Sequence, residues 1–414
     1  MNRDDLNRAD AAAAFAAPAA VDRIQRLGLI VGVVGAVLCA IGFFVSPEYF
    51  FRSWLVGWVY WMGVALGCFA IFMLHHLTRG DWGLVVRRVM EAASRTLPWL
   101  FLLAIPILVD LLTSKTLYIW SRPDVVRGDE LLQAKEPYLN VPFYLVRFAL
   151  YFLIWGGFAF VLNRMSLRQD TSDDPGLTRR MQLIAAFGLA AYCLAVTFAS
   201  VDWLMSLDPH WFSTIYGVYL MGSQGLAALA FLIAIATFLS RREPMAGVIQ
   251  PRHYHDWGKL FLAFVMLWAY FSFSQFLIIW SGNLPEEIPW YLRRMQGLWG
   301  FVTLAIVLFH FALPFVLLLS RDLKRNTRLL TGVALLMLVM RWVDLLWQVE
   351  PNFAHGNGHG EAHQSNIALY WLYLAAPAAI GGIWLFLFVR ELKKRPLLPV
   401  NDPYLPEAIA HDGH

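Results

Sequence analysis

The chain has 414 residues, of which 59% are hydrophobic and only 15% are charged, and its formal net charge is +4. Soluble globular domains carry roughly 25% charged residues. The composition therefore excludes a soluble enzyme, a disordered chain and a disulfide scaffold, and it predicts an all-α, polytopic membrane protein. The 18 Trp, 15 Tyr and 30 Phe fit this class, because aromatic side chains gather where membrane helices meet water.

A helix needs about 20 predominantly apolar residues to cross a bilayer, and ten stretches of this sequence meet that requirement. They follow an N-terminal segment, 1–23, that lacks the pattern of a signal peptide. Between the second and third stretches, residues 81–91 are predicted to form a short amphipathic surface helix. The ten predicted spans are 24–46, 54–77, 95–113, 141–162, 181–204, 212–240, 256–281, 292–320, 327–349 and 367–390.

The distribution of positive charge orients these spans. If the N-terminus is cytoplasmic, most of the 33 Lys and Arg residues fall in cytoplasmic segments, including the tail 392–414, and few fall in outer loops. Lys and Arg are enriched on the cytoplasmic side of membranes. The pattern therefore predicts that both termini are cytoplasmic.

Three short sequence matches recur in the same order and indicate an internal repeat. The second copies lie 160, 147 and 142 residues after the first, and they are Leu117–Ser121 with Leu277–Ser281, Pro142–Leu145 with Pro289–Leu292, and Val201–Leu204 with Val343–Leu346. Both copies enter from the same side, so the repeat is parallel, about an axis along the membrane normal. It predicts two four-helix bundles, 94–240 and 256–391. The two spans within 24–93 are predicted to pack outside them.

Ionisable side chains inside a bilayer are costly and are therefore candidates for function. The residues predicted to form a proton relay are Asp110, Asp202, His310, Arg341 and Asp344. Asp110 has no basic neighbour close by in its own helix, which favours a relay. Arg341 and Asp344 lie three residues apart on one helix face, so they can equally form a neutral structural pair. His310 is either a relay residue or a hydrogen-bonded packing residue.

The repeat divides these candidates into two groups. Asp202 aligns with Asp344, and a residue present in both copies suits an architectural role. The other three candidates have no counterpart of the same kind, which suits a role particular to one bundle. The aligned residues are Tyr270 for Asp110, Asn163 for His310 and Ala199 for Arg341.

The sequence carries little that could hold a cofactor. No C-x-x-C spacing occurs among the three cysteines, so neither an iron–sulfur site nor covalent haem is expected. A b-type haem needs two histidines at facing depths, whereas His75 and His76 lie at the edge of span 2 and His310 stands apart. A loop with His355, His359 and His363 has a spacing that permits a metal site, but a solvated loop is the favoured interpretation.

Three features of the chain together resemble one membrane family. They are the ten spans, the repeat and the segment SVDWLMSLDPHWFS at residues 200–213. The chain resembles the NrfD/PsrC-like membrane subunits of quinone-linked oxidoreductases, and it is most similar to the ActF-type subunit of alternative complex III. The resemblance covers nearly the whole chain. It implies an integral subunit of a bacterial quinol:electron-acceptor oxidoreductase of the cytochrome c type, located in the cytoplasmic membrane.

The same resemblance implies how such a complex divides its work. Haem and iron–sulfur clusters reside on partners, namely an iron–sulfur subunit and c-type cytochrome subunits, beside a sister NrfD-like membrane subunit. This chain is expected to bind quinone or menaquinone, to move protons, or both, without catalytic residues of its own. Lipid surrounds it, and no nucleic acid is expected. Residues 114–140, an outer loop of mixed charge, are the predicted contact surface for partners.

Two other classes of protein remain open. A secondary transporter also combines parallel repeats with intramembrane charges, but its helices are usually broken at matching positions of both halves. A purely structural anchor would use the buried charges only for packing. Co-purification with haem-containing partners would favour the oxidoreductase subunit over both.

Overall fold

The computed structural model describes residues 13–172, 174, 176–353 and 366–410. Every regular element in these ranges is a helix, and ten helical spans are long and apolar enough to cross a membrane. The predicted all-α, multi-pass membrane architecture is therefore confirmed. The spans are α2 (Ala20–Val45), α3 (Pro47–Thr78), α5–α7 (Arg87–Ser94, Leu97–Leu103, Ile105–Leu112), α10 (Val141–Gln169), α11 (Gly176–Trp203), α12 (Tyr216–Ser240), α13 (Pro251–Gly282), α15–η3–α16 (Gly297–Ala305, Ile306–Ala312, Leu313–Leu319), α18 (Thr327–Val349) and α19 (Leu372–Leu392).

Local sequence signals set where several spans begin. The side chain of Asn140 accepts a hydrogen bond from the Phe143 amide at the start of α10, and Asn326 caps α18 in the same way. Such caps satisfy amide groups that have no partner within the helix. Proline stands in the first turn of α10, where its missing N–H costs nothing.

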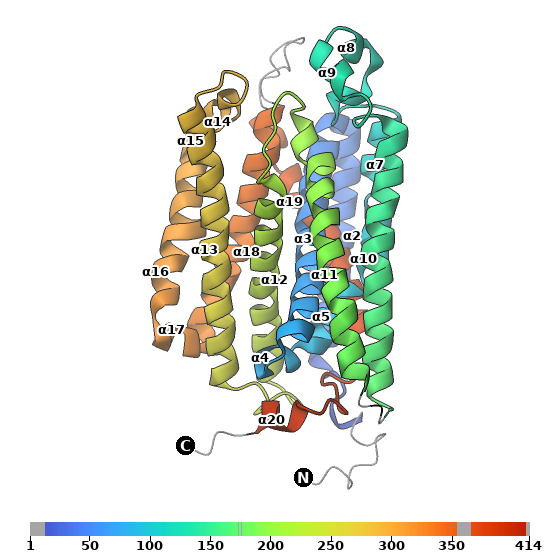
Figure 1. Cartoon of the computed structure of the whole chain (residues 1–414), viewed down its shortest axis with the longest axis vertical. Coiled ribbons are helices and arrows are strands. Elements are labelled where there is room, and N and C mark those ends of the chain that lie inside the picture. Colours follow the sequence, from blue (N-terminus) through green and yellow to red (C-terminus); the bar gives the residue numbers. More distant parts are fainter. Residues whose placement is uncertain (1–12, 173, 175, 354–365, 411–414) are drawn as a thin grey trace.

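Short helices cover the two ends of the helical body (Figure 1). α8 (Pro123–Arg127) and α9 (Glu130–Lys135) lie at one end, which we call the loop end. α20 (Leu405–Ile409) and the start of α2 lie at the opposite end, which we call the tail end. Most of the remaining short helices also lie at these ends: α4 (Asp81–Leu84), α14 (Ile288–Met295) and α17 (Arg321–Arg325).

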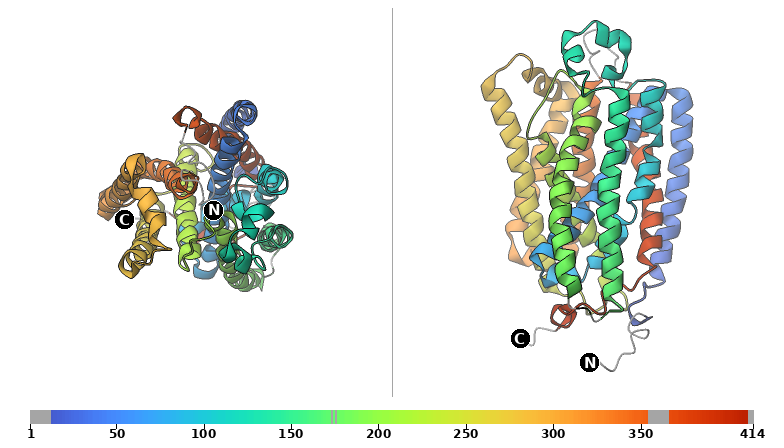
Figure 2. Two further views of the ribbon diagram at one scale, coloured as in Figure 1. Left: turned by 90° about the horizontal axis from the view of Figure 1, so that it is seen from above. Right: turned by 45° about the vertical axis from the view of Figure 1, so that its right-hand side comes forward.

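The helices group differently from the two predicted bundles. Bundle one consists of α3, α6–α7, α10 and α11, and bundle two consists of α12, α13, α15–η3–α16 and α18. These are spans 2–5 and 6–9, rather than spans 3–6 and 7–10. α2 and α19, the first and last spans, pack against each other beside the bundles (Figure 2).

The difference in bundle membership arises from the position of span 2, which is α3. It was predicted to pack outside, but the apolar window of α3 is 89% buried, against 28% for α2. α3 contacts α11, α12 and α19 and so lies at the centre of the molecule. The three sequence matches fall in spans 3–5 and 7–9, so they could not reveal which helix is the fourth member of each bundle.

Close backbone contact holds the α2–α19 pair together. A Cβ atom added at Gly32 would lie 2.8 Å from the Ile383 amide nitrogen, and one at Gly35 would lie 2.6 Å from the Ala379 nitrogen. Only glycine permits this approach, and small residues are the usual means by which membrane helices pack closely. The opposite face of α2 carries exposed apolar side chains, as a lipid-facing helix requires.

The predicted surface helix 81–91 is also wrong in its placement. α4 is a single turn, and α5 joins α6 and α7 in span 3, which begins at Arg87 rather than at residue 95. Arg87, Arg88 and Glu91 are at most 1% exposed. These charges can be buried because they neutralise one another and are met by charges that lie far along the chain.

Candidate functional site

The carboxylate of bundle one, Asp202, is held by a bidentate arginine. Arg147 of α10 donates from Nε to Oδ2 at 2.9 Å and from Nη2 to Oδ1 at 2.8 Å, and Tyr151 donates its hydroxyl to Oδ2 at 2.6 Å. The Arg147 guanidinium also stacks 3.8 Å from the Tyr138 ring centroid. Paired N–H groups of this kind are the strongest way to hold a carboxylate. The Asp202 carboxylate is therefore held in one orientation near the loop end by two side chains of α10.

The carboxylate of bundle two, Asp344, has a different set of partners. It pairs with Arg341 one turn earlier on α18, and it accepts a hydrogen bond from the Tyr219 hydroxyl of α12 at 2.6 Å. The Gln348 side-chain amide reaches its Oδ2 at 3.2 Å. Asp344 is fully buried. Arg341 and Asp344 thus form the predicted ion pair. Asp344 has two further partners, Tyr219 and Gln348, that the sequence did not suggest.

His310 lies within the π-helical segment η3 and is fully buried. Its ring lies 4.1 Å from the Trp268 ring, and neither ring nitrogen has a hydrogen-bond partner among the described residues. It interacts electrostatically with Arg341. Buried polar groups without partners cost about 1–3 kcal/mol, and π-helical segments occur often at functional sites. The described residues therefore give no support to the alternative that His310 is a hydrogen-bonded packing residue.

Asp110 lies apart from these groups, at the end of α7. Its carboxylate accepts hydrogen bonds from the Thr116 amide at 3.0 Å, the Leu117 amide at 2.9 Å and the Thr116 hydroxyl. These donors belong to the chain that follows the helix. The arrangement holds the turn in place, and a relay role for Asp110 stays a prediction.

We expect Asp110→Ala to lower the free energy of unfolding by about 2–3 kcal/mol, because the Thr116 and Leu117 amide groups lose their hydrogen-bond acceptor. Unfolding by titration with sodium dodecyl sulfate measures this change. Asp124→Ala, in the same outer region but without a helix-end contact of this kind, is the control and should change stability by less than about 0.5 kcal/mol. Equal effects of the two substitutions would contradict the structural role of Asp110.

Two buried arginines were missed as a pair in the sequence. Arg147 and Arg294 lie at the outer ends of predicted spans 141–162 and 292–320 and were not among the candidate residues, but they are only 6% and 0% exposed. The match of Pro142–Leu145 with Pro289–Leu292 has an offset of 147 residues, and the same offset places Arg147 on Arg294. Extending that match by two residues would have found them.

Arg294 does not repeat the contacts of Arg147. It donates to the carbonyl oxygens of Trp290, Trp347 and Gln348 at 2.8, 3.1 and 2.7 Å, and to Oδ1 of Asn352 at 2.9 Å. Its guanidinium lies 3.4 Å from the Trp290 ring centroid. Burial, with the neighbouring charge of Arg293 added, lowers the pKa of Arg294 to about 9. This is a desolvated cation without a carboxylate partner among the described residues.

A second group of buried charges, the tail-end network, surrounds Glu91 of α5. Glu91 accepts hydrogen bonds from Arg87 at 3.2 Å, Arg88 at 2.6 Å, Ser166 at 2.5 Å and Arg395 at 3.1 Å. Burial raises the pKa of Asp170 at the network's edge, although Arg88 opposes this. Three further ion pairs in the network join Arg87 to Asp402, Arg88 to Asp170, and Arg95 to Glu391. The network ties span 3 to the end of α10 and to the C-terminal tail.

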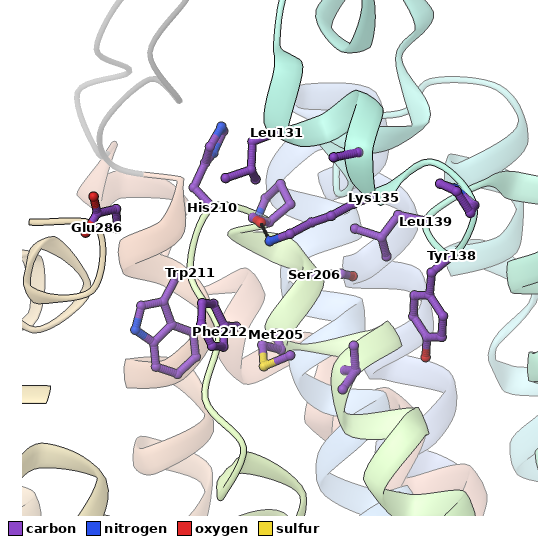
Figure 3. A pocket seen from close by; sticks show the side chains of 14 residues that line it. Leu131, Lys135, Tyr138, Leu139, Met205, Ser206, His210, Trp211, Phe212 and Glu286 are labelled. Atoms are coloured by element: carbon purple, nitrogen blue, oxygen red, sulfur yellow. Dashed lines mark hydrogen bonds between the residues drawn. The ribbon is translucent and has the colours of Figure 1, made fainter. Parts of the chain in front are cut away.

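A cavity of about 520 Å³ opens at the loop end beside bundle one (Figure 3). Its lining is mostly apolar and aromatic, with Tyr138, Trp211 and Phe212 among its side chains. His210 lies at its edge, where its Nε2 is 2.6 Å from Oδ2 of Asp129. Pockets of this size and character accommodate small amphipathic molecules. The wall also contains Val201 and Ser206, the sequence neighbours of Asp202.

Within the described residues no group of His, Cys, Asp and Glu side chains is arranged to hold a metal ion. His355, His359 and His363, for which the sequence permitted a metal site, lie outside the described residues. His75 and His76 are buried at the tail-end side of α3, where His75 contacts Trp82.

Comparison with known proteins adds no name to this site. No protein-family model matches the sequence, and no curated protein matches it either.

Proposed function

We propose that this chain is a membrane subunit of a bacterial quinol:electron-acceptor oxidoreductase and that it carries protons through bundle two. The observation that supports this most is the fully buried Asp344, bonded to Arg341 and Tyr219, with His310 nearby in η3. A carboxylate, an arginine and a free imidazole at membrane depth are the usual parts of a proton path. Both termini would be cytoplasmic, as the positive charges indicate.

The chemistry of quinol oxidation creates the need for such a path. Oxidation of a hydroquinone releases two protons as well as two electrons, and protons cross a low-dielectric region along titratable side chains. His310 is fully buried and neither of its ring nitrogens has a hydrogen-bond partner among the described residues, so either nitrogen can accept or release a proton. His310 is the group best suited to pass a proton, with Arg341 and Asp344 as the charged pair that responds to it.

The proposal gives the redox chemistry to partners. Haem and iron–sulfur clusters would be held by an iron–sulfur subunit and c-type cytochromes, beside a sister membrane subunit. Residues 114–140, which include α8 and α9 at the loop end, carry mixed charge. A surface of this kind suits a contact with these partner subunits. The neighbouring cavity, with aromatic walls and His210 at its edge, suits a quinone or menaquinone head group.

A secondary transporter is less well supported. Its substrate site normally requires helices that are broken at matching positions of the two halves. Here η3 interrupts span 8, whereas its repeat partner α10 is a continuous α-helix. Span 3 is divided into α5, α6 and α7, whereas its partner α13 is continuous. The interruptions do not match.

The test uses the assembled complex in sealed vesicles, with Asp344→Asn and His310→Ala. We expect proton movement coupled to quinol oxidation to fall by about 100-fold or more, since proton transfer by a positioned side chain contributes at least that factor. Asp256→Asn, at an exposed carboxylate paired with Lys259, is the control and should leave coupling unchanged. Assembly with wild-type proton movement in both variants would refute the proposal.

A further inference from the structure

The two halves of the repeat each have one matching carboxylate, Asp202 or Asp344, but they differ in the number of buried arginines. In bundle one, Asp202 has Arg147 as its ion-pair partner, and the position that aligns with Arg341 is Ala199. In bundle two, the counterpart of Arg147 is Arg294, and Arg341 is an additional arginine. Bundle two therefore has two buried arginines, Arg294 and Arg341, where bundle one has only Arg147.

The present structure uses only one of these arginines as an ion pair. Asp344 pairs with Arg341, while Arg294 donates to carbonyl oxygens and to Asn352. A buried guanidinium that lacks an anion is costly. Arg294 is fully buried, so the fold retains an expensive cation that the repeat would otherwise have paired with Asp344.

Gln348 connects the two arginines. Its backbone carbonyl accepts from Arg294 Nη2 at 2.7 Å, and its side-chain amide donates to Asp344 Oδ2 at 3.2 Å. Its side-chain oxygen accepts from the Tyr216 hydroxyl at 2.9 Å. Residues 344 and 348 are one helical turn apart, about 6 Å along the axis. Arg294 and Asp344 thus share Gln348 as a contact, and an exchange requires the Arg294 side chain to leave its carbonyl partners and turn toward the Asp344 carboxylate.

We propose that Arg294 is the alternative ion-pair partner of Asp344, and that the carboxylate exchanges between Arg341, which holds it here, and Arg294, which occupies the position that Arg147 has in bundle one. The exchange rests on the proposed function only in taking Asp344 to respond to proton movement. Arg294 is thus a positioning residue. It keeps a counter-ion beside Asp344 whenever Arg341 turns toward another group, such as the neighbouring His310.

The repeat supplies the experiment and its control. Infrared spectroscopy of the full chain in lipid nanodiscs at neutral pH detects the carbonyl band of a protonated carboxyl group, and Asp344→Asn identifies the part that belongs to Asp344. In Arg341→Gln we expect no such band, because Arg294 pairs with the carboxylate. In Arg341→Gln combined with Arg294→Gln we expect a band of one carboxyl group per chain. In bundle one, Arg147→Gln alone should produce the band of Asp202.

Two results would overturn the proposal. One is a full Asp344 band in Arg341→Gln alone, since Arg294 would then give no compensation. The other is the absence of the band in the double variant while Arg147→Gln shows it, since Asp344 would then stay ionised without either arginine. Neither measurement depends on quinol turnover, so a failure here is distinct from a failure of the proton path in vesicles.

A second measurement avoids the double variant, which can fail to fold. Nuclear magnetic resonance of arginine labelled with nitrogen-15 reports the guanidinium of Arg294. Arg341→Gln should shift that signal, and adding Asp344→Asn should return it to its wild-type position. A signal that stays unchanged in Arg341→Gln would contradict the exchange.

Discussion

Glu91→Gln should lower the free energy of unfolding by about 3–5 kcal/mol, the effect of removing one partner from a buried ion pair. Glu91 is fully buried and accepts hydrogen bonds from Arg87, Arg88 and Arg395. Glutamine keeps the size of the side chain but leaves these guanidinium groups without their shared anion. Titration with sodium dodecyl sulfate in mixed micelles, followed by tryptophan fluorescence, measures the change.

An exposed ion pair is the matched control for Glu91. Lys259 and Asp256 are 58% and 43% exposed and pair at 3.1 Å at the same end of the molecule. Asp256→Asn should change stability by less than about 1 kcal/mol, as exposed pairs generally do. If the two substitutions have equal effects, the buried charges at the tail end do not stabilise the fold.

Arg147→Gln should also lower the free energy of unfolding by about 3–5 kcal/mol. The substitution leaves the buried Asp202 carboxylate with the neutral Tyr151 hydroxyl as its remaining hydrogen-bond donor, and it removes the stacking of the guanidinium on Tyr138. Thermal unfolding of the purified chain, followed by size-exclusion chromatography, gives the order of stability. Arg147→Lys should recover part of the loss, because it restores the charge but not the bidentate geometry.

The corresponding change in bundle two provides the comparison. Arg341→Gln should cost less than Arg147→Gln, because Tyr219 and Gln348 remain bonded to Asp344 and the proposed exchange lets Arg294 replace the lost arginine. Equal losses at the two positions would show that Asp344 depends on a single arginine, as Asp202 does.

The spans could be predicted from local sequence because a bilayer imposes a local requirement. About 20 apolar residues cross it wherever they occur, and ten such helical spans are present in the described residues. The repeat was also visible, because short matches survive at the ends of spans 3–5 and 7–9. Membership of the bundles was not visible, because α2 and α3 are both apolar enough to cross a membrane, with mean hydropathies of 2.7 and 1.9. Their difference in burial depends on the helices that pack around each of them.

In the candidate site, too, contacts within one helix could be predicted from the sequence, whereas contacts between helices could not. Arg341 and Asp344 lie one turn apart, so helix geometry alone predicted their pairing. The contribution of Tyr219 required knowing that α12 lies beside α18. Arg87, Arg88 and Glu91 were interpreted as a solvated surface because their partners Asp170, Asp402 and Arg395 lie some 80 to 300 residues further along the chain.

The sequence by itself determined that this is a multi-pass helical membrane protein with a repeated core and with ionisable groups at membrane depth. Those properties follow from the composition of each segment, because whether a segment can lie in a bilayer depends mainly on its own apolar length. Only the tertiary structure decided which charges are buried, what neutralises them and which helices form each bundle. The reason is that an ion can leave water only if its partners are brought to it, and in this chain those partners come from helices distant in sequence.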